Sequence, residues 1–197
     1  MPAALASKDE VIDRLFPVFR DRGFEGASLA DLSRASGLGR SSLYHYFPGG
    51  KEEMAEAVLV RALEVTEAVF AEPDASQKTL KQRIRHVVAA IEGIYAGGRN
   101  ACLLGQFATS PLAAEGRRRL HEAFTRWIDA VEALAVEAGL TPVRARDFAE
   151  DWVARVQGAL LLQAATGGTG PFDRAMGALL RLANKDGIGR VSVQETA

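Results

Sequence analysis

The sequence predicts an all-α protein of about nine helices, arranged as a three-helix N-terminal domain followed by a larger helical domain. Apolar residues recur at three- and four-residue spacing through most of the 197 residues, which is the spacing of amphipathic helices. Glycine and proline clusters, among them PGG and GGTGP, separate these stretches and indicate where helices end. Apolar and polar residues alternate only around residues 190–194, a segment too short and isolated to form a sheet.

The composition is that of an ordinary soluble globular protein. Hydrophobic residues make up 48% and charged residues 25%, and the formal net charge is -1. The single cysteine, Cys102, allows no intrachain disulfide and no zinc framework, which favours the cytoplasm. The chain opens without a secretory signal, and glycine interrupts its longest uncharged stretch, residues 156–172. We therefore expect a cytoplasmic protein without membrane contact, metal or cofactor.

The first helix is expected to begin after Ser7, because Ser7 and Glu10 have the spacing of a capping box. Its apolar stripe continues to about Arg22, and Gly23 is expected to end the helix. Pro17 lies inside this stripe. A proline there lacks the N–H of a helical hydrogen bond, so we expect a kink at Pro17.

Two short helices joined by a turn follow, and together they predict a helix-turn-helix. Ser28 is expected to cap the first, Gly37 to end it in a left-handed conformation, and Gly39 to cap the second. The segment PGG ends the second helix. The side chains expected to face the core are those of Leu29, Leu32, Ala35, Leu43 and Phe47.

Longer helices make up the rest of the chain. They are expected over residues 51–70, 76–96, 102–109, 112–138, 143–166 and 172–184. The first of them would run from one domain into the next. We place the domains over residues 1–53 and 54–197.

The outward side of the second short helix is polar, hydrogen-bonding and partly aromatic. An α-helix fits the major groove of DNA, where arginine reads guanine and hydroxyl groups bind bases or phosphates. Spacings of three and four residues place on this side Arg40, Ser41, Tyr44 and His45. The pattern as a whole favours DNA binding, although each residue taken singly is better explained as an ordinary helix residue.

Charge supports the same interpretation. Between Asp31 and Glu52 the charged side chains, apart from His45, are all positive: Arg34, Arg40 and Lys51. Lys51 begins the next helix, whose N-terminal dipole also favours phosphate.

The segment SLADLSRASGLGRSSLYHYFPGGKEEM resembles the signature of TetR-family regulators. The resemblance spans about residues 8–65, and LLGQFATS with the later helices resembles the subgroup that controls multidrug or lincosamide efflux genes. It implies a ligand-responsive repressor that binds a palindromic operator as a homodimer and is released by a small, apolar or aromatic effector. It also implies DNA contacts from Ser28, Arg40, Ser41, Ser42, Tyr44, His45, Tyr46 and Lys51.

Residues 153–166 are apolar or small on nearly all sides, which indicates a helix covered by more than its own core. Together with the last helix it predicts a four-helix dimer interface, and a buried central helix in a monomer is the alternative. The interface is expected to contain Leu160, Phe172, Met176, Leu179 and Leu180.

An effector pocket is implied by the resemblance, and aromatic or adaptable side chains of the middle helices are candidates for its lining. Core packing explains most of these side chains equally well. The candidates are Tyr95, Cys102, Phe107, Phe124, Trp127, Trp152 and Gln157.

Enzyme motifs are missing from the sequence. The three histidines are far apart, there is no CxxC pair, and GLGRSS lacks the lysine of a phosphate-binding loop. The competing functions are therefore a DNA-binding dimer that shapes DNA or recruits proteins without an effector, and a protein-interaction module that ignores DNA.

Overall fold

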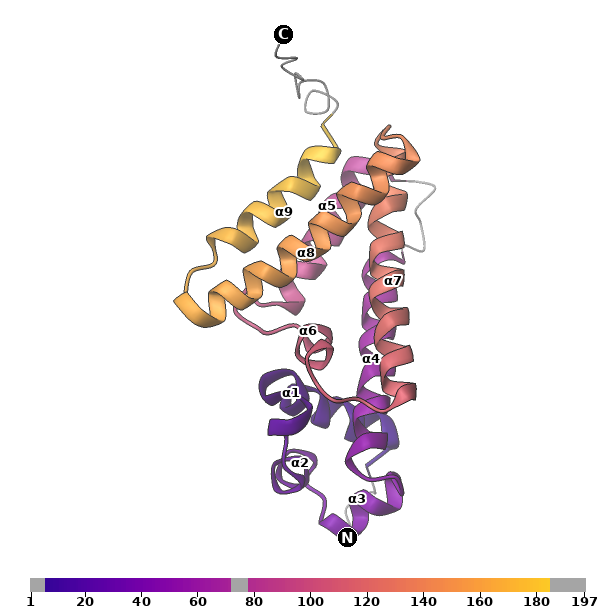
Figure 1. Cartoon of the computed structure of the whole chain (residues 1–197), viewed down its shortest axis with the longest axis vertical. Helices are drawn as coiled ribbons and strands as arrows, with labels where there is room; N and C mark the ends of the chain where they lie inside the picture. Colours follow the sequence, from indigo (N-terminus) through magenta and orange to yellow (C-terminus); the bar gives the residue numbers. More distant parts are fainter. Residues whose placement is uncertain (1–5, 72–77, 185–197) are drawn as a thin grey trace. The chain divides into compact units, whose positions relative to one another are not determined.

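The computed structural model describes residues 6–71 and 78–184, which form helices and loops without a strand (Figure 1). The expected all-α class is confirmed. The helices are α1 Lys8–Gly26, α2 Leu29–Ser36, α3 Arg40–Tyr46, α4 Lys51–Phe70, α5 Leu80–Ile94, α6 Leu103–Ala108, α7 Ala114–Glu137, α8 Pro142–Thr166 and α9 Gly170–Leu182. The alternating segment around residues 190–194 and the expected helix start at Ser76 lie outside the described residues. Within those residues, no helix is both long and apolar enough to cross a membrane.

Helix α1 begins as expected, and its break lies at Gly23, the residue expected to end it, rather than at Pro17. The Ser7 hydroxyl accepts a hydrogen bond from the Glu10 amide at 3.2 Å, and the Glu10 carboxylate accepts one from the Ser7 amide at 2.8 Å. Pro17 keeps helical dihedral angles, because the φ fixed by its ring is compatible with a helix. The chain leaves the helical conformation at Gly23, with φ +67° and ψ -179°, and resumes it as far as Gly26.

The contacts of the chain form two compact units. The first unit takes in Met1–Ala68 and Arg99–Trp127, and the second takes in Val69–Gly98 and Ile128–Ala197. In the first unit α6 packs on α1, and the ring of Phe107 meets the rings of Phe19 and Phe24 edge-on, with centroids 5.6 and 6.5 Å away. The compact unit therefore extends beyond residue 53.

The second unit is built on α8 and α9, which run side by side in opposite directions (Figure 1). The indole N–H of Trp152 donates to the carbonyl of Ala175 at 2.7 Å and so joins the two helices inside the core. Gly98 approaches α9 closely. Its φ is +89°, and a Cβ placed there would lie 2.8 Å from Cγ of Phe172, so the site accepts only glycine without distortion.

Candidate nucleic-acid interface

Hydrogen bonds at both ends of α2 fix the helix-turn-helix. The Ser28 hydroxyl accepts from the Asp31 amide at 3.1 Å and donates to the Asp31 carboxylate at 2.6 Å. This hydrogen bond, opposed by desolvation and assisted by Arg22, lowers the pKa of Asp31. At the other end Gly37 has φ +73°, the left-handed conformation expected for it. The caps predicted at Ser28 and Gly37 are confirmed.

Hydrogen bonds from α1 and from α2 fix the turn between α2 and α3. The guanidinium of Arg14 in α1 donates to the carbonyl of Ser36 at 2.8 Å. The hydroxyl of Ser33 donates to the carbonyl of Leu38 at 2.6 Å. Ser36 is fully buried, whereas Ala35, expected in the core, is exposed. The buried serine is tolerated because its hydroxyl is hydrogen-bonded to the Ser33 carbonyl at 3.1 Å.

Helix α3 buries one side and leaves the other open. Leu43 and Phe47 are 1% and 0% exposed and anchor the helix, which begins after Gly39 as predicted. The exposed side chains are Arg40, Ser41, Ser42, Tyr44 and His45. Among the described residues Arg40 makes no ion pair, so its guanidinium keeps its donors for an outside acceptor.

The PGG segment brings Tyr44 against the start of α4. Gly50 has φ +69°, and a Cβ there would lie 3.3 Å from Cε1 of Tyr44. The amide of Gly49 donates to the carboxylate of Glu53 at 2.8 Å. Tyr44 is still 45% exposed, so its hydroxyl stays accessible beside the turn.

Tyr46 is placed differently from the exposed residues of α3. It is half-buried, and its hydroxyl donates to the carbonyl of Ala6 at 2.5 Å. This bond ties the end of α3 to the chain just before α1. The hydroxyl that the sequence assigns to DNA contact therefore has a partner within the chain.

Lys51 is also engaged within the chain. Its ammonium donates to the carbonyl of Glu25 at 3.2 Å and lies 4.7 Å from the centre of the Phe24 ring. Desolvation lowers the pKa of Lys51, and the Glu25 carboxylate opposes this effect. Both contacts hold the side chain on the end of α1.

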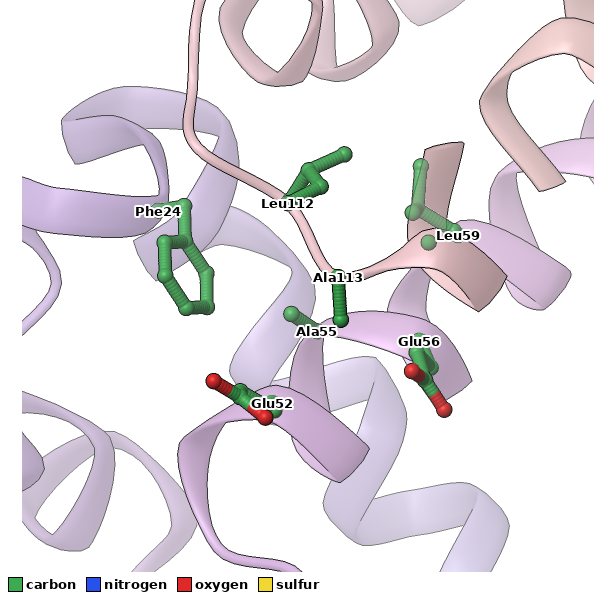
Figure 2. A pocket seen from close by; sticks show the side chains of 8 residues that line it. Phe24, Glu52, Ala55, Glu56, Leu59, Leu112 and Ala113 are labelled. Atoms are coloured by element: carbon green, nitrogen blue, oxygen red, sulfur yellow. The ribbon is translucent and has the colours of Figure 1, made fainter. Parts of the chain in front are cut away.

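The Phe24 ring also borders a small hollow on the first unit. Figure 2 shows Phe24 on one side of this hollow, with Leu112 and Ala113 above residues of α4. Its free volume is about 10 Å³, which is room for roughly one water molecule and not for an organic effector. The remaining residues around it are Glu52, Ala55, Glu56, Leu59 and Gly116.

The expected effector residues are divided between the two compact units. In the first unit Cys102 and Phe107 are buried, and the rings of Phe124 and Trp127 stack on each other with centroids 6.3 Å apart. In the second unit the ring of Tyr95 packs edge-on against Phe172 at 6.0 Å. Trp152 is buried as described above, and Gln157 is half-buried. Packing within the chain accounts for most of these side chains.

Most of the expected interface residues are covered by their own chain. Phe172 and Leu179 are 0% exposed and Met176 is 2% exposed, because α9 turns them towards α5 and α8. Leu160 is also buried, and Leu180 is half-buried. The exposed large apolar side chains of α8 are Val143, Leu161 and Leu162. The expected interface set stays a prediction.

Sequence reasoning missed Phe24, Glu25, Arg14 and Ala6, which hold the proposed DNA-contacting elements in place. Three of these contacts use backbone carbonyls. A carbonyl carries no residue-specific signal, so neither spacing nor charge pattern could have identified them. Among the described residues, no group of three or more histidine, cysteine or acidic side chains is arranged to hold a metal ion.

Known proteins resemble the chain over both units. Residues 11–58 match the model of bacterial regulatory proteins of the tetR family, and residues 97–178 match the C-terminal domain of LmrA/YxaF-like transcriptional regulators. The transcriptional regulator LmrA of Bacillus subtilis is 26% identical over 79% of this chain and 85% of its own. The transcriptional repressor DhaR of a Mycobacterium species is 26% identical over 78% of this chain and 80% of its own.

Solved structures share the fold. A TetR transcriptional regulator from Legionella pneumophila superposes with a TM-score of 0.80 at 20% identity, covering 91% of this chain and 98% of that one. A TetR-family regulator from Agrobacterium tumefaciens superposes with a TM-score of 0.75 at 23% identity, covering 88% of this chain and 95% of that one.

Proposed function

Because the chain belongs to the TetR family of DNA-binding transcriptional regulators, we propose that it is a homodimeric repressor that binds a palindromic operator and is released by a small apolar or aromatic effector. The exposed polar face of α3 carries this proposal. It combines Arg40, which makes no ion pair with any described residue, with two serine hydroxyls, a tyrosine hydroxyl and a histidine on one side of a helix anchored by buried Leu43 and Phe47. Such a face suits the major groove.

The residues of the interface have two roles in this proposal. Arg40, Ser41, Ser42, Tyr44 and His45 contact bases and phosphates, because they are exposed. Ser28, Tyr46 and Lys51 position them: Ser28 caps α2, Tyr46 anchors the end of α3, and Lys51 joins α4 to α1. Residues 1–53 bind DNA, residues 54–197 carry the effector response and the dimer contact, and the protein works in the cytoplasm.

The outer side of α8 supports the homodimer. Leu161 and Leu162 are 72% and 50% exposed, on a helix whose exposed neighbours Ala164 and Ala165 allow close approach. Large apolar side chains exposed on a small-residue surface are costly in water and are typical of interfaces. A two-fold axis through this surface would present two α3 helices to two half-sites.

The experiment has two steps on the full chain. The first is sedimentation of the protein on DNA from upstream of its own gene, which is expected to give two chains per duplex. The second is a screen of small molecules for loss of fluorescence anisotropy from that complex. Release by a compound that also raises the melting temperature of the free protein would support the repressor. A stable complex that no compound releases would favour the effector-independent DNA-binding dimer.

A further inference from the structure

The second unit contains a mainly apolar cavity apart from the residues expected to bind an effector. Its volume is about 180 Å³. Residues of the last turn of α4, of α5 and of α7 form its lining: Phe70, Arg83, Val87, Ala130, Ala133 and Leu134. Five of these six side chains are apolar, and Arg83 is the one charged residue among them.

The volume has room for a molecule of about one ring. An engineered apolar cavity of about 150 Å³ is known to hold benzene, while drug-sized ligands need about 300 Å³ or more. The aromatic ring of Phe70 and the branched side chains of Val87 and Leu134 offer apolar surface to such a ring. The cavity is open to solvent on one side, where Ala133 is exposed, so a benzene-sized group fits with part of its surface outside.

Arg83 offers that substituent a hydrogen-bond donor. Its Nη1 donates to both carboxylate oxygens of Glu137, at 2.9 and 2.6 Å, and the Arg83 side chain is 24% exposed. A guanidinium has five N–H donors in a planar fork. Arg83 can thus keep its hydrogen bonds to Glu137 and donate another to a second acceptor in the cavity.

The charges around the cavity favour an anion as that acceptor. From residue 80 to residue 91 α5 contains Lys81, Arg83 and Arg85, and no aspartate or glutamate. On α7 the carboxylates of Asp129 and Glu132 are both bound by Arg146, at 2.8 and 3.2 Å. Arg83 is the one charged residue among those that line the cavity, so the charge that an occupant meets there is positive.

We propose that this cavity binds a small aromatic carboxylate, with the ring among Phe70, Val87 and Leu134 and the carboxylate accepting hydrogen bonds from Arg83. Its binding depends on the cavity alone, whereas its action as the effector rests on the proposed function. The cavity joins α5 and α7 to the end of α4, the helix that begins at Lys51. An occupant would therefore contact the helix whose other end lies next to the candidate DNA-contacting residues.

Benzoate is the probe, and benzyl alcohol is its uncharged counterpart. Each is titrated into the full chain by calorimetry, with ligand-observed NMR as the second readout, since so small a ligand binds weakly. The variants are Arg83→Met, which keeps the apolar stem and removes the donors, and Ala133→Leu, which fills the cavity. Arg85→Met is the matched control, because Arg85 lies exposed on the same helix and does not line the cavity.

The proposal expects benzoate to bind the wild type and Arg85→Met alike and Arg83→Met about tenfold more weakly, as for the loss of a charge-assisted hydrogen bond. Benzyl alcohol should bind the wild type and Arg83→Met equally, and Ala133→Leu should bind neither probe. Absence of benzoate binding by the wild type, or undiminished binding by folded Arg83→Met and Ala133→Leu, would overturn the site. Benzoate that binds at Arg83 without releasing operator DNA would uphold the site and contradict its role as the effector site.

Discussion

The ammonium of Lys51 lies 4.7 Å from the centre of the Phe24 ring and donates to the carbonyl of Glu25 at 3.2 Å. The first residue of α4 is thereby fixed to the last part of α1. The same Phe24 ring meets Phe107 of α6 edge-on. The Phe24 side chain therefore links α1, α4 and α6 within the first unit. The ammonium of Lys51, which directly follows the PGG segment, provides the contact from α4.

The first prediction separates a positioning role of Lys51 from a phosphate contact. Lys51→Met should lower the free energy of unfolding by about 1 kcal/mol, because it removes a cation–π contact and a hydrogen bond. It should leave the slope of log affinity against log salt concentration unchanged, whereas the loss of one phosphate contact reduces this slope by about 0.9. The measurement is DNA binding by the wild type and by Lys51→Met over a range of salt concentrations. A slope reduced by about 0.9 in Lys51→Met would show that the ammonium leaves Phe24 to bind phosphate.

The second prediction uses two tyrosines of one helix as mutual controls. Tyr46→Phe removes the hydrogen bond to the Ala6 carbonyl and should lower stability by about 1 kcal/mol with DNA affinity nearly unchanged. Tyr44→Phe removes an exposed hydroxyl and should weaken DNA binding about tenfold without changing stability. Urea denaturation and anisotropy titration measure the two quantities. The reverse pattern, with affinity lost in Tyr46→Phe alone, would be incompatible with the proposed roles.

The third prediction concerns the cap of α2 and pH. The hydrogen bond from Ser28 lowers the pKa of Asp31 in the folded chain below the ordinary value of an aspartate. The ionised carboxylate therefore favours folding, and its contribution is present above the ordinary pKa of aspartate and lost as the pH falls through the lower, folded value. The unfolding free energy of the wild type should thus fall more steeply on acidification through this range than that of Asp31→Asn. Parallel curves in urea titrations at several pH values would argue against the cap as the cause.

The fourth prediction compares two glycines of the second unit. Gly98→Ala should lower stability by about 2 kcal/mol or more, because its Cβ meets Phe172 at 2.8 Å and its φ is +89°. Gly93 is the next-to-last residue of α5, and a Cβ there meets nothing within 4 Å. Gly93→Ala should leave stability unchanged or raise it by up to about 0.5 kcal/mol through helix propensity. Thermal unfolding of both variants measures the contrast, and similar effects at the two sites would refute the close approach of Gly98 to Phe172.

The local elements could be predicted from the sequence, because caps and apolar periodicity act within a few residues. Ser7, Ser28, Gly37 and Gly39 all lie at the helix ends expected of them. The break at Gly23 was predicted as a helix end, and the kink expected at Pro17 did not form there. Periodicity alone cannot decide between a proline whose φ suits a helix and a glycine that adopts a φ of +67°.

The partners of side chains could not be predicted in the same way. The family resemblance implies DNA contacts from Lys51 and Tyr46, but it gives no sign that backbone carbonyls far along the chain bind both side chains. Phe172, Met176 and Leu179 are expected at a dimer surface, and within one chain they are already buried against α5 and α8. An apolar side chain indicates burial and does not say whether its own chain or a partner covers it.

Selection of randomised DNA duplexes by the purified full chain tests the central claim most directly, since it needs no knowledge of the operator. The account predicts enrichment of inverted repeats whose half-sites lie about 34 to 36 Å apart or a multiple of that distance, and a relaxed consensus for Arg40→Ala. Failure of the folded wild type to enrich any shared sequence would contradict recognition of an operator by α3. The same contradiction would follow if Arg40→Ala and Tyr44→Ala each selected the same consensus as the wild type.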